Sequence, residues 1–264
     1  MTIAMSVFGL KREDNIMSIA TSKPVFSHKD DKIKDVINKM VSTGFRRMPI
    51  VSGKKEVVGI VTKTDILDAF LRKENFSEEI STIMIRDVIK CKHTDSIGYV
   101  LDKFKISRRG GFPIVKDAKL VGIISERDFV KKMPSSKIGL AVHDVMTSKP
   151  FIVTTALSIL DCLRAIVNTK YRKIPVVEEG KLVGIISSAD LMKYIHSSNY
   201  NYDFLDESIT NIIVRNVITI EKEADVSEAV KKMLSNNIGS VIVVNEDKTL
   251  EGIITERDIV EELE

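Results

Sequence analysis

Gly59-Ile-Val-Thr-Lys-Thr-Asp65 is one of four copies of a single pattern in this chain of 264 residues. The other copies are Gly122-Ile-Ile-Ser-Glu-Arg-Asp128, Gly184-Ile-Ile-Ser-Ser-Ala-Asp190 and Gly252-Ile-Ile-Thr-Glu-Arg-Asp258. Successive aspartates are 63, 62 and 68 residues apart. A pattern Gly-aliphatic-aliphatic-Ser/Thr-x-x-Asp, kept at near-constant spacing, indicates four internal repeats. We call this pattern the repeat motif.

A β-hairpin is predicted to contain the first half of each motif. A short apolar run precedes every copy, and a polar, turn-rich connection separates run from motif, which is typical of two antiparallel strands. The apolar runs are Met48-Pro-Ile-Val51, Phe112-Pro-Ile-Val115, Ile174-Pro-Val-Val177 and Val241-Ile-Val-Val244.

Helices are predicted on both sides of each hairpin. Before the first hairpin, apolar residues recur at helical spacing from Ile33 to Val41, and Val226 to Leu234 repeats this before the fourth. A second helical pattern follows each motif, as in Ile66 to Leu71. The motif therefore covers the exit of a strand and the first turn of a helix, where its hydroxyl can cap that helix.

The four repeats alternate between two types. Repeats 1 and 3 share Thr21-Ser-Lys-Pro24 and Thr147-Ser-Lys-Pro150, and both carry an aromatic-basic-basic-aliphatic-Pro string before the hairpin. Repeats 2 and 4 lack both features and end their motifs in Glu-Arg-Asp. A two-repeat unit has therefore been duplicated. The predicted boundaries are 17–74, 81–133, 142–197 and 209–264, with residues 1–16 expected to form an N-terminal tail that is flexible or docks elsewhere.

Composition limits the classes of function. The chain is 44% apolar and 29% charged, as expected of a globular protein, and its net charge of +3 is too small to indicate nucleic-acid binding. Its two cysteines and four histidines show no metal-ligand spacing, so no metal site is predicted. The sequence holds no nucleophile elbow, phosphate-binding P-loop or membrane-length apolar run. We therefore predict a cytoplasmic protein that is not an enzyme and has no catalytic cofactor.

The four motifs, the Val145-Met-Thr-Ser-Lys-Pro150 start and the basic-x-Pro-aliphatic hairpins resemble CBS (cystathionine β-synthase) domains. The resemblance covers about residues 17–264. It implies an α/β (α+β) fold in which βαββα repeats pair as two Bateman modules, each with a pseudo-twofold axis. Four repeats without another domain are similar to the gamma subunit of AMP-activated protein kinase and to stand-alone archaeal CBS proteins.

The resemblance also implies a ligand. Clefts of such modules take AMP, ADP or ATP, and some take S-adenosylmethionine. The motif aspartates would hold the ribose: Asp65, Asp128, Asp190 and Asp258. The motif hydroxyls would contact phosphate: Thr62, Ser125, Ser187 and Thr255. The adenine pocket would be lined by Thr21, Ser22, Lys23, Pro24, Val25, Met48, Pro49, Thr147, Ser148, Lys149, Pro150, Ile152, Ile174 and Pro175.

Elementary chemistry agrees with these roles. A carboxylate accepts both hydrogen bonds of a ribose diol, and a helix N-terminus favours phosphate. Phosphate also pairs with guanidinium and ammonium groups. The basic candidates near the hairpins and motifs are Arg46, Arg47, Arg108, Arg109, Arg127, Arg172, Lys173 and Arg257.

The sequence therefore favours an adenine-nucleotide-binding regulatory or energy-sensing protein that acts on an unidentified protein partner through the geometry of its modules. One alternative is a non-catalytic interaction scaffold with vestigial clefts. Others are an S-adenosylmethionine-binding or a nucleic-acid-binding CBS protein, the last disfavoured by the near balance of charge. Two modules could close into a monomeric disc or share faces in a homodimer, and no membrane partner is predicted.

Overall fold

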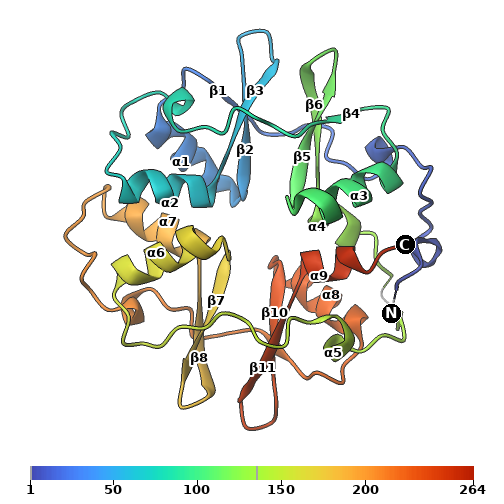
Figure 1. Ribbon diagram of the computed structural model, residues 1–264, viewed down its shortest axis with the longest axis vertical. Coiled ribbons are helices and arrows are strands. Elements are labelled where there is room, and N and C mark those ends of the chain that lie inside the picture. The colour runs from blue at the N-terminus through green and yellow to red at the C-terminus, as the bar shows by residue number, and fades with distance from the viewer. Residues whose placement is uncertain (1, 135) are drawn as a thin grey trace. The chain divides into compact units, whose positions relative to one another are not determined.

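The computed structural model describes residues 2–134 and 136–264 (Figure 1). The chain forms two compact units, each assembled from separated stretches. Unit 1 contains the chain up to Pro24, together with Ile89–Pro150 and Ile218–Glu264, and unit 2 contains Val25–Val88 and Phe151–Val217. Unit 1 therefore holds the bodies of repeats 2 and 4, and unit 2 those of repeats 1 and 3.

Unit 2 contains the same order of elements twice. Repeat 1 supplies β1 (Ser27–His28), α1 (Ile33–Thr43), β2 (Arg47–Val51), β3 (Val57–Thr62) and α2 (Lys63–Leu71), followed by the 3-10 turn η3 (Ile80–Thr82). Repeat 3 supplies α6 (Ile159–Thr169), β7 (Lys173–Glu178), β8 (Lys181–Ser187) and α7 (Ser188–Ser197), followed by η4 (Ile209–Asn211). Helix α2 packs against α6 and α7, and α1 packs against α7.

Unit 1 has the same plan. Repeat 2 supplies β4 (Cys91–Lys92), α3 (Ile97–Ser107), β5 (Gly111–Lys116), β6 (Lys119–Ser125) and α4 (Glu126–Val130). Repeat 4 supplies β9 (Thr219–Ile220), α8 (Val226–Ser235), β10 (Ser240–Val244), β11 (Leu250–Thr255) and α9 (Glu256–Glu261). The short elements η1 (Met5–Phe8), η2 (Ile16–Ser18) and α5 (Val142–Val145) complete the unit, and α4 packs against α9.

The predicted hairpins and flanking helices are confirmed in all four repeats. Each hairpin is antiparallel, and in three repeats a two-residue strand pairs with it in parallel, as β1 does with β2. In repeat 3 this strand is reduced to a bridge between Val153 and Val176. Alternation along β3 buries Val57 and Val61, and the apolar stripe of α1 buries Ile33, Val36 and Met40 beneath the sheet.

The residues that open each repeat lie on the hairpin of its sequence neighbour. Ile85, which opens repeat 2, exchanges two backbone hydrogen bonds with Ile60 of repeat 1 (3.0 and 2.9 Å). Reciprocally, Thr21 of repeat 1 exchanges two with Ile123 of repeat 2 (both 3.0 Å). The pairs Thr147–Ile253 and Ile185–Val214 repeat the arrangement between repeats 3 and 4. These exchanged segments tie repeat 1 to repeat 2, and repeat 3 to repeat 4.

The motif glycine is required by this exchange. A Cβ atom on Gly184 would lie 2.0 Å from Cγ2 of Ile213 and 3.1 Å from the carbonyl oxygen of Val214, which belong to the exchanged segment. At Gly252 the corresponding obstacles are Sδ of Met146 at 2.6 Å and the carbonyl oxygen of Thr147 at 2.9 Å. Only hydrogen fits between motif strand and segment, which explains a glycine in every copy.

The N-terminal segment is a folded part of unit 1, so of the two alternatives expected for this tail, flexible or docking, it has the docking form. The backbone N–H of Ile3 donates to Glu262 (2.7 Å), and that of Met5 donates to Glu264 (2.9 Å). The side chains of Ile3 and Met5 are 2% exposed and belong to the core of unit 1. Burial of apolar side chains outweighs the entropy of ordering these few residues.

Candidate functional site

Each motif aspartate closes a capping box at the start of the helix that follows it. In repeat 1, Oδ2 of Asp65 accepts from the backbone N–H of Thr62 and from its Oγ1, both at 2.7 Å. The N–H of Asp65 donates back to Oγ1 of Thr62 at 3.4 Å. Repeat 3 shows the same box, in which Oδ2 of Asp190 accepts from the N–H and Oγ of Ser187. Capping thus uses Oδ2, while Oδ1 of Asp65 and of Asp190 accepts no hydrogen bond from any residue that the structure describes.

The predicted phosphate contact of the motif hydroxyls acquires a competing partner. A hydroxyl has one proton to donate, and in Thr62, Ser125 and Ser187 it points to the motif carboxylate. A phosphate would have to replace the carboxylate as acceptor of the hydroxyl hydrogen bond, or accept instead from the backbone N–H groups at the helix N-terminus. The contact of Thr62, Ser125, Ser187 and Thr255 with phosphate stays a prediction.

Strand register places a different residue opposite the motif hydroxyl in the two units. In unit 2, Arg47 pairs with Thr62, and Lys173 pairs with Ser187. In unit 1 the same position is glycine or serine: Gly111 faces Ser125, and Ser240 faces Thr255. Unit 2 therefore brings a cation to each motif, whereas unit 1 brings a small neutral residue. Oγ of Ser240 is buried without a hydrogen-bond partner among the described residues.

Two reciprocal ion pairs join repeats 2 and 4 within unit 1. Nη1 of Arg127 in repeat 2 lies 3.0 Å from Oε1 of Glu256 in repeat 4, and Nε of Arg257 lies 3.0 Å from Oε1 of Glu126. Arg127 also donates to the carbonyl of Ile238, and Arg257 to that of Arg108. The carboxylates are deeply buried, since the side chains of Glu256 and Glu126 are 1% and 2% exposed.

Two of the predicted phosphate ligands, Arg127 and Arg257, are therefore engaged in joining repeats 2 and 4. The other two candidates in unit 1, Arg108 and Arg109, are exposed. Arg108 caps the C-terminus of α3 in a left-handed conformation with φ 52°. In unit 2, Arg46 and Arg172 precede the hairpins, and their carbonyls accept from the first N–H of α2 and of α7. The basic predictions in unit 2 thus lie beside the motifs.

Sequence reasoning missed Lys63, the first residue of α2. Its side chain is 6% exposed, and Nζ donates to the carbonyl of Gly44 at the end of α1 (3.1 Å). Burial lowers the pKa of Lys63 to about 8, and the nearby charges of Arg46 and Lys193 act in the same direction. Asp190 of repeat 3 opposes them. Its position between Ser/Thr and Asp of a motif was the only available signal.

Burial shifts the pKa values of the two motif aspartates of unit 1. Burial raises the pKa of Asp258 to about 6, against the hydrogen bonds from Thr255, and it also raises the pKa of Asp128. Asp128 is 5% exposed, so its carboxylate is scarcely reachable by a ribose. Asp65 and Asp190 are half-buried. Unit 2 therefore offers the more accessible pair of carboxylates.

We expect Asp258 to oppose stability at neutral pH. Its folded pKa lies above the ordinary value of 3.8, so the folded chain holds the proton more tightly, and its contribution is present below about pH 4 and lost as the pH rises through 6. The free energy of unfolding should therefore fall by up to about 3 kcal/mol between pH 4 and 7 from this group. Asp258→Asn should lack this fall, as urea denaturation across that range would show.

Asp247, an exposed residue of the same repeat, provides the control. Asp247→Asn should leave the pH profile parallel to that of the unchanged protein. Parallel profiles for Asp258→Asn as well would show that the buried carboxyl does not titrate in this range.

The residues predicted to line an adenine pocket divide into three groups. Met48 and Ile174 are core residues at 0% exposure, because the inward face of the strand packs on helices, and their contact with a base stays a prediction. Pro49 and Pro175 are also buried. Thr21 to Pro24 and Thr147 to Pro150 belong to unit 1. The exposed members of the set in unit 2 are Val25 and Ile152.

An aromatic pair near the start of repeat 3 was not predicted. Phe151 and Tyr171 stack with ring centroids 6.2 Å apart, although they are 41% and 56% exposed. Repeat 1 has Val25 and Phe45 at the same positions, at 39% and 46%. Both repeats of unit 2 therefore present an apolar surface suited to a flat ring.

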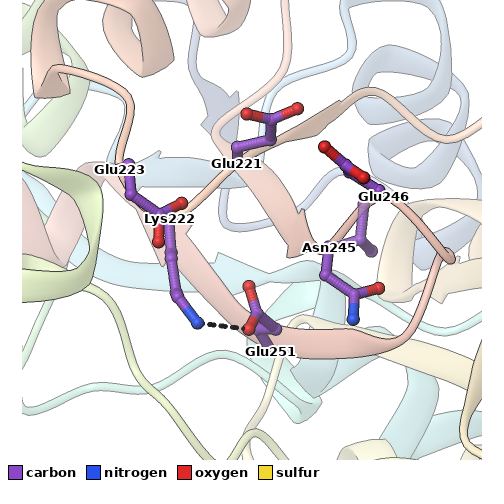
Figure 2. A pocket seen from close by; sticks show the side chains of 7 residues that line it. Glu221, Lys222, Glu223, Asn245, Glu246 and Glu251 are labelled. Atoms are coloured by element: carbon purple, nitrogen blue, oxygen red, sulfur yellow. Dashed lines mark hydrogen bonds and ion pairs between the residues drawn. The ribbon is translucent and has the colours of Figure 1, made fainter.

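A pocket of about 140 Å³ at the end of the repeat 4 hairpin is lined by none of the predicted residues. Figure 2 shows Glu221, Glu223, Glu246 and Glu251 around it, with Lys222 paired to Glu251 at 2.6 Å. Its acidic lining would repel a phosphate. Among described residues no cluster of His, Cys, Asp or Glu has the arrangement of a metal site. No helix in the described part of the chain is long and apolar enough to cross a membrane.

Comparison with known protein families agrees with this geometry. The model of the CBS domain matches residues 16–72, 80–135, 142–197 and 209–264. The chain belongs to the CBS-domain family. Each match contains one hairpin and its flanking helices, and the exchanged segments join the four CBS domains as two Bateman modules. CBS-domain proteins are in general regulatory and non-catalytic.

Similar proteins match nearly the whole length of this chain. The uncharacterized protein MJ1225 of Methanocaldococcus jannaschii is 30% identical over 275 residues, covering 92% of this chain and 97% of that protein. Its crystal structure, proposed as an archaeal homologue of the gamma subunit of AMP-activated protein kinase, matches with a TM-score of 0.87 over 94% of this chain and 99% of that one. An uncharacterized conserved protein of Pyrococcus horikoshii, 20% identical, has the same fold at a TM-score of 0.66 over 94% of this chain and 99% of that one.

Proposed function

We propose that this protein binds adenine nucleotides in unit 2 and regulates a protein partner by doing so. The observation that supports this proposal is that, in repeats 1 and 3 alone, a cation lies opposite the motif hydroxyl that binds a half-buried motif carboxylate. Arg47 is opposite Thr62, which donates to Asp65, and Lys173 is opposite Ser187, which donates to Asp190. Each carboxylate keeps Oδ1 clear of hydrogen bonds from described residues. CBS domain pairs in regulatory proteins bind adenine nucleotides or S-adenosylmethionine.

Each chemical group of a nucleotide finds a counterpart in unit 2. Oδ1 of Asp65 or Asp190 can accept from a ribose hydroxyl while Oδ2 maintains the helix cap. The exposed pairs Val25–Phe45 and Phe151–Tyr171 supply apolar surface for a purine. Arginine and lysine at the hairpins supply charge for phosphate. This set favours a nucleotide over S-adenosylmethionine, whose sulfonium cation would meet the same positive charges.

The corresponding groups in unit 1 are directed at each other. Arg127 and Arg257 pair with glutamates, and Asp128 is buried. We therefore expect nucleotide to bind at repeats 1 and 3, with repeats 2 and 4 serving mainly to hold unit 1 together. A regulated partner would then read changes that start in unit 2.

Calorimetric titration with AMP, ADP, ATP, S-adenosylmethionine and adenosine tests this function. We expect Asp65→Asn or Asp190→Asn to weaken nucleotide binding at the affected repeat about tenfold or more, because a charged acceptor for the ribose diol is lost. Asparagine retains an Oδ1 that can accept the capping hydrogen bonds, so the helix should remain.

Asp128→Asn and Asp258→Asn are the matched controls in unit 1, and nucleotide affinity should be unchanged in both. A loss of affinity in the controls but not in the unit 2 variants would transfer the site to unit 1. Absence of binding by any adenine ligand at millimolar concentration would refute the proposal and favour the interaction scaffold.

A further inference from the structure

Lys63 is a buried cation without a carboxylate partner in the described part of the chain. Among the described residues its ammonium donates one hydrogen bond, to the carbonyl of Gly44, although it carries three protons. Gly44 ends α1, and the negative end of that helix offsets part of the charge. The other charges acting on Lys63 are Arg46 in repeat 1, and Lys193 and Asp190 on α7 in repeat 3. Two of these three are positive.

Unit 1 has acidic residues at the position that corresponds to Lys63. There the first helical residues are Glu126 and Glu256, and each pairs with an arginine of the opposite repeat. In unit 2 the corresponding residues are Lys63 and Ser188, followed by Thr64 and Ala189, so no acid is available at these positions. A buried charge is expensive unless it is paired. Unit 2 thus retains the positive charge of Lys63 where repeats 1 and 3 meet. In unit 1 the corresponding residues are acids that pair with arginines.

We propose that Lys63 completes an anion site at the contact of repeats 1 and 3, where one phosphate group pairs with its ammonium beside Arg46 and Lys193. The proposal rests on the proposed function in naming a nucleotide as the source of that phosphate. Inorganic phosphate and pyrophosphate offer the same chemistry. Because Lys63 belongs to repeat 1 and two of its charged neighbours to repeat 3, an anion bound there links the two repeats.

Anion binding at this site should be accompanied by proton uptake. In the empty site Arg46 and Lys193 oppose the charged form of Lys63, while Asp190 and the end of α1 favour it, and burial leaves the pKa at about 8. A bound phosphate would raise that pKa, since a neighbouring opposite charge favours the charged form. At pH 8 Lys63 is about half protonated in the ligand-free protein, so anion binding should be accompanied by uptake of as much as about half a proton.

Titration calorimetry at pH 8 in two buffers of different ionisation enthalpy measures this uptake. The phosphate groups of AMP and ADP are almost fully ionised at this pH, because their last pKa is about 6, so these two ligands report the proton uptake, whereas pyrophosphate, which keeps a proton at pH 8, tests affinity alone. The ligands are pyrophosphate, AMP, ADP and adenosine, and the variants are Lys63→Met and Lys63→Arg, with Lys54→Met as a control at an exposed lysine of the same repeat.

We expect Lys63→Met to weaken binding of pyrophosphate and ADP about tenfold or more and to abolish proton uptake, while adenosine binding is unchanged. Lys63→Arg should restore affinity without proton uptake, because arginine stays charged at pH 8. A structural role alone would lower thermal stability in Lys63→Met. Removal of a buried charge that has no carboxylate partner should leave the melting temperature of the ligand-free protein equal or higher, since Gly44 is an exposed residue whose carbonyl can bind water instead.

The two proposals fail in different ways. Equal affinities and equal proton uptake in the unchanged protein and in Lys63→Met would overturn the anion site while leaving nucleotide binding intact. Binding of pyrophosphate through Lys63 without binding of adenosine, AMP or ADP would support the anion site and overturn the nucleotide. If the unchanged protein bound none of these ligands, both proposals would be overturned.

Discussion

Replacing Glu256 by glutamine should lower the free energy of unfolding by about 2–4 kcal/mol. The carboxylate is 1% exposed, and its partner Arg127 is 21% exposed, so the guanidinium would remain largely desolvated without a counter-charge. The hydrogen bonds of Arg127 to Ile238 and Asn237 fix it in place and prevent it from turning to solvent. Urea denaturation at pH 7 measures the loss.

The double variant Arg127→Met/Glu256→Leu separates pairing from burial. Because both charges are removed together, most of the lost stability should return. Asp102→Asn serves as the control. Nη2 of Arg12 donates to both carboxylate oxygens of Asp102, but the two side chains are 45% and 52% exposed, so a loss of about 1 kcal/mol or less is expected there. A loss in Glu256→Gln no larger than in Asp102→Asn would show that the buried pair does not hold repeats 2 and 4 together.

Local structure was readable from the sequence because its causes are local. The motif predicted a strand that ends at Ser or Thr and a helix that begins there, and the capping boxes at Thr62 and Ser187 have that geometry. Helical spacing from Ile33 to Val41 predicted the buried face of α1. These features depend on residues a few positions apart, and each was present in several copies.

The grouping of the repeats could not be read in this way. The alternation of two repeat types was visible in the sequence. The sequence did not show that repeats of the same type share a unit, because that grouping depends on contacts such as the one between Arg127 and Glu256, which are 129 residues apart. In retrospect the Glu-Arg-Asp endings of repeats 2 and 4 carry the signal, since each supplies an acid and a base that can be exchanged. The packing of Ile3 and Met5 against the C-terminal residues is another non-local contact without a sequence signature.

The candidate site was predicted by resemblance in its carboxylates and only partly in its cations. Register places Arg47 and Lys173 opposite the motif hydroxyls, and their contact with phosphate stays a prediction. Met48 and Ile174 lie in the core, in strands whose central residues are buried on both faces. Lys63 was overlooked because a lysine at the start of a helix is ordinarily solvated, and its burial follows from packing between repeats.

Gly184→Ala should destabilise unit 2 by about 1–3 kcal/mol, which is the usual range for an overpacked core position. The added Cβ would lie 2.0 Å from Cγ2 of Ile213, and a β-branched side chain cannot swing aside as a methionine can. The carbonyl of Val214, 3.1 Å away, is fixed by its hydrogen bond from Ile185, so the whole exchanged segment would have to move. Chemical denaturation measures the loss.

Gly53→Ala, in a hairpin turn with open space around the new methyl group, should be neutral or slightly stabilising. If Gly184→Ala behaved like Gly53→Ala, the motif glycine would not be required by the exchanged segment. Since Ile185 lies two residues before Ser187, displacement of the segment should also disturb the helix cap formed by Asp190, and nucleotide affinity at repeat 3 should fall together with stability.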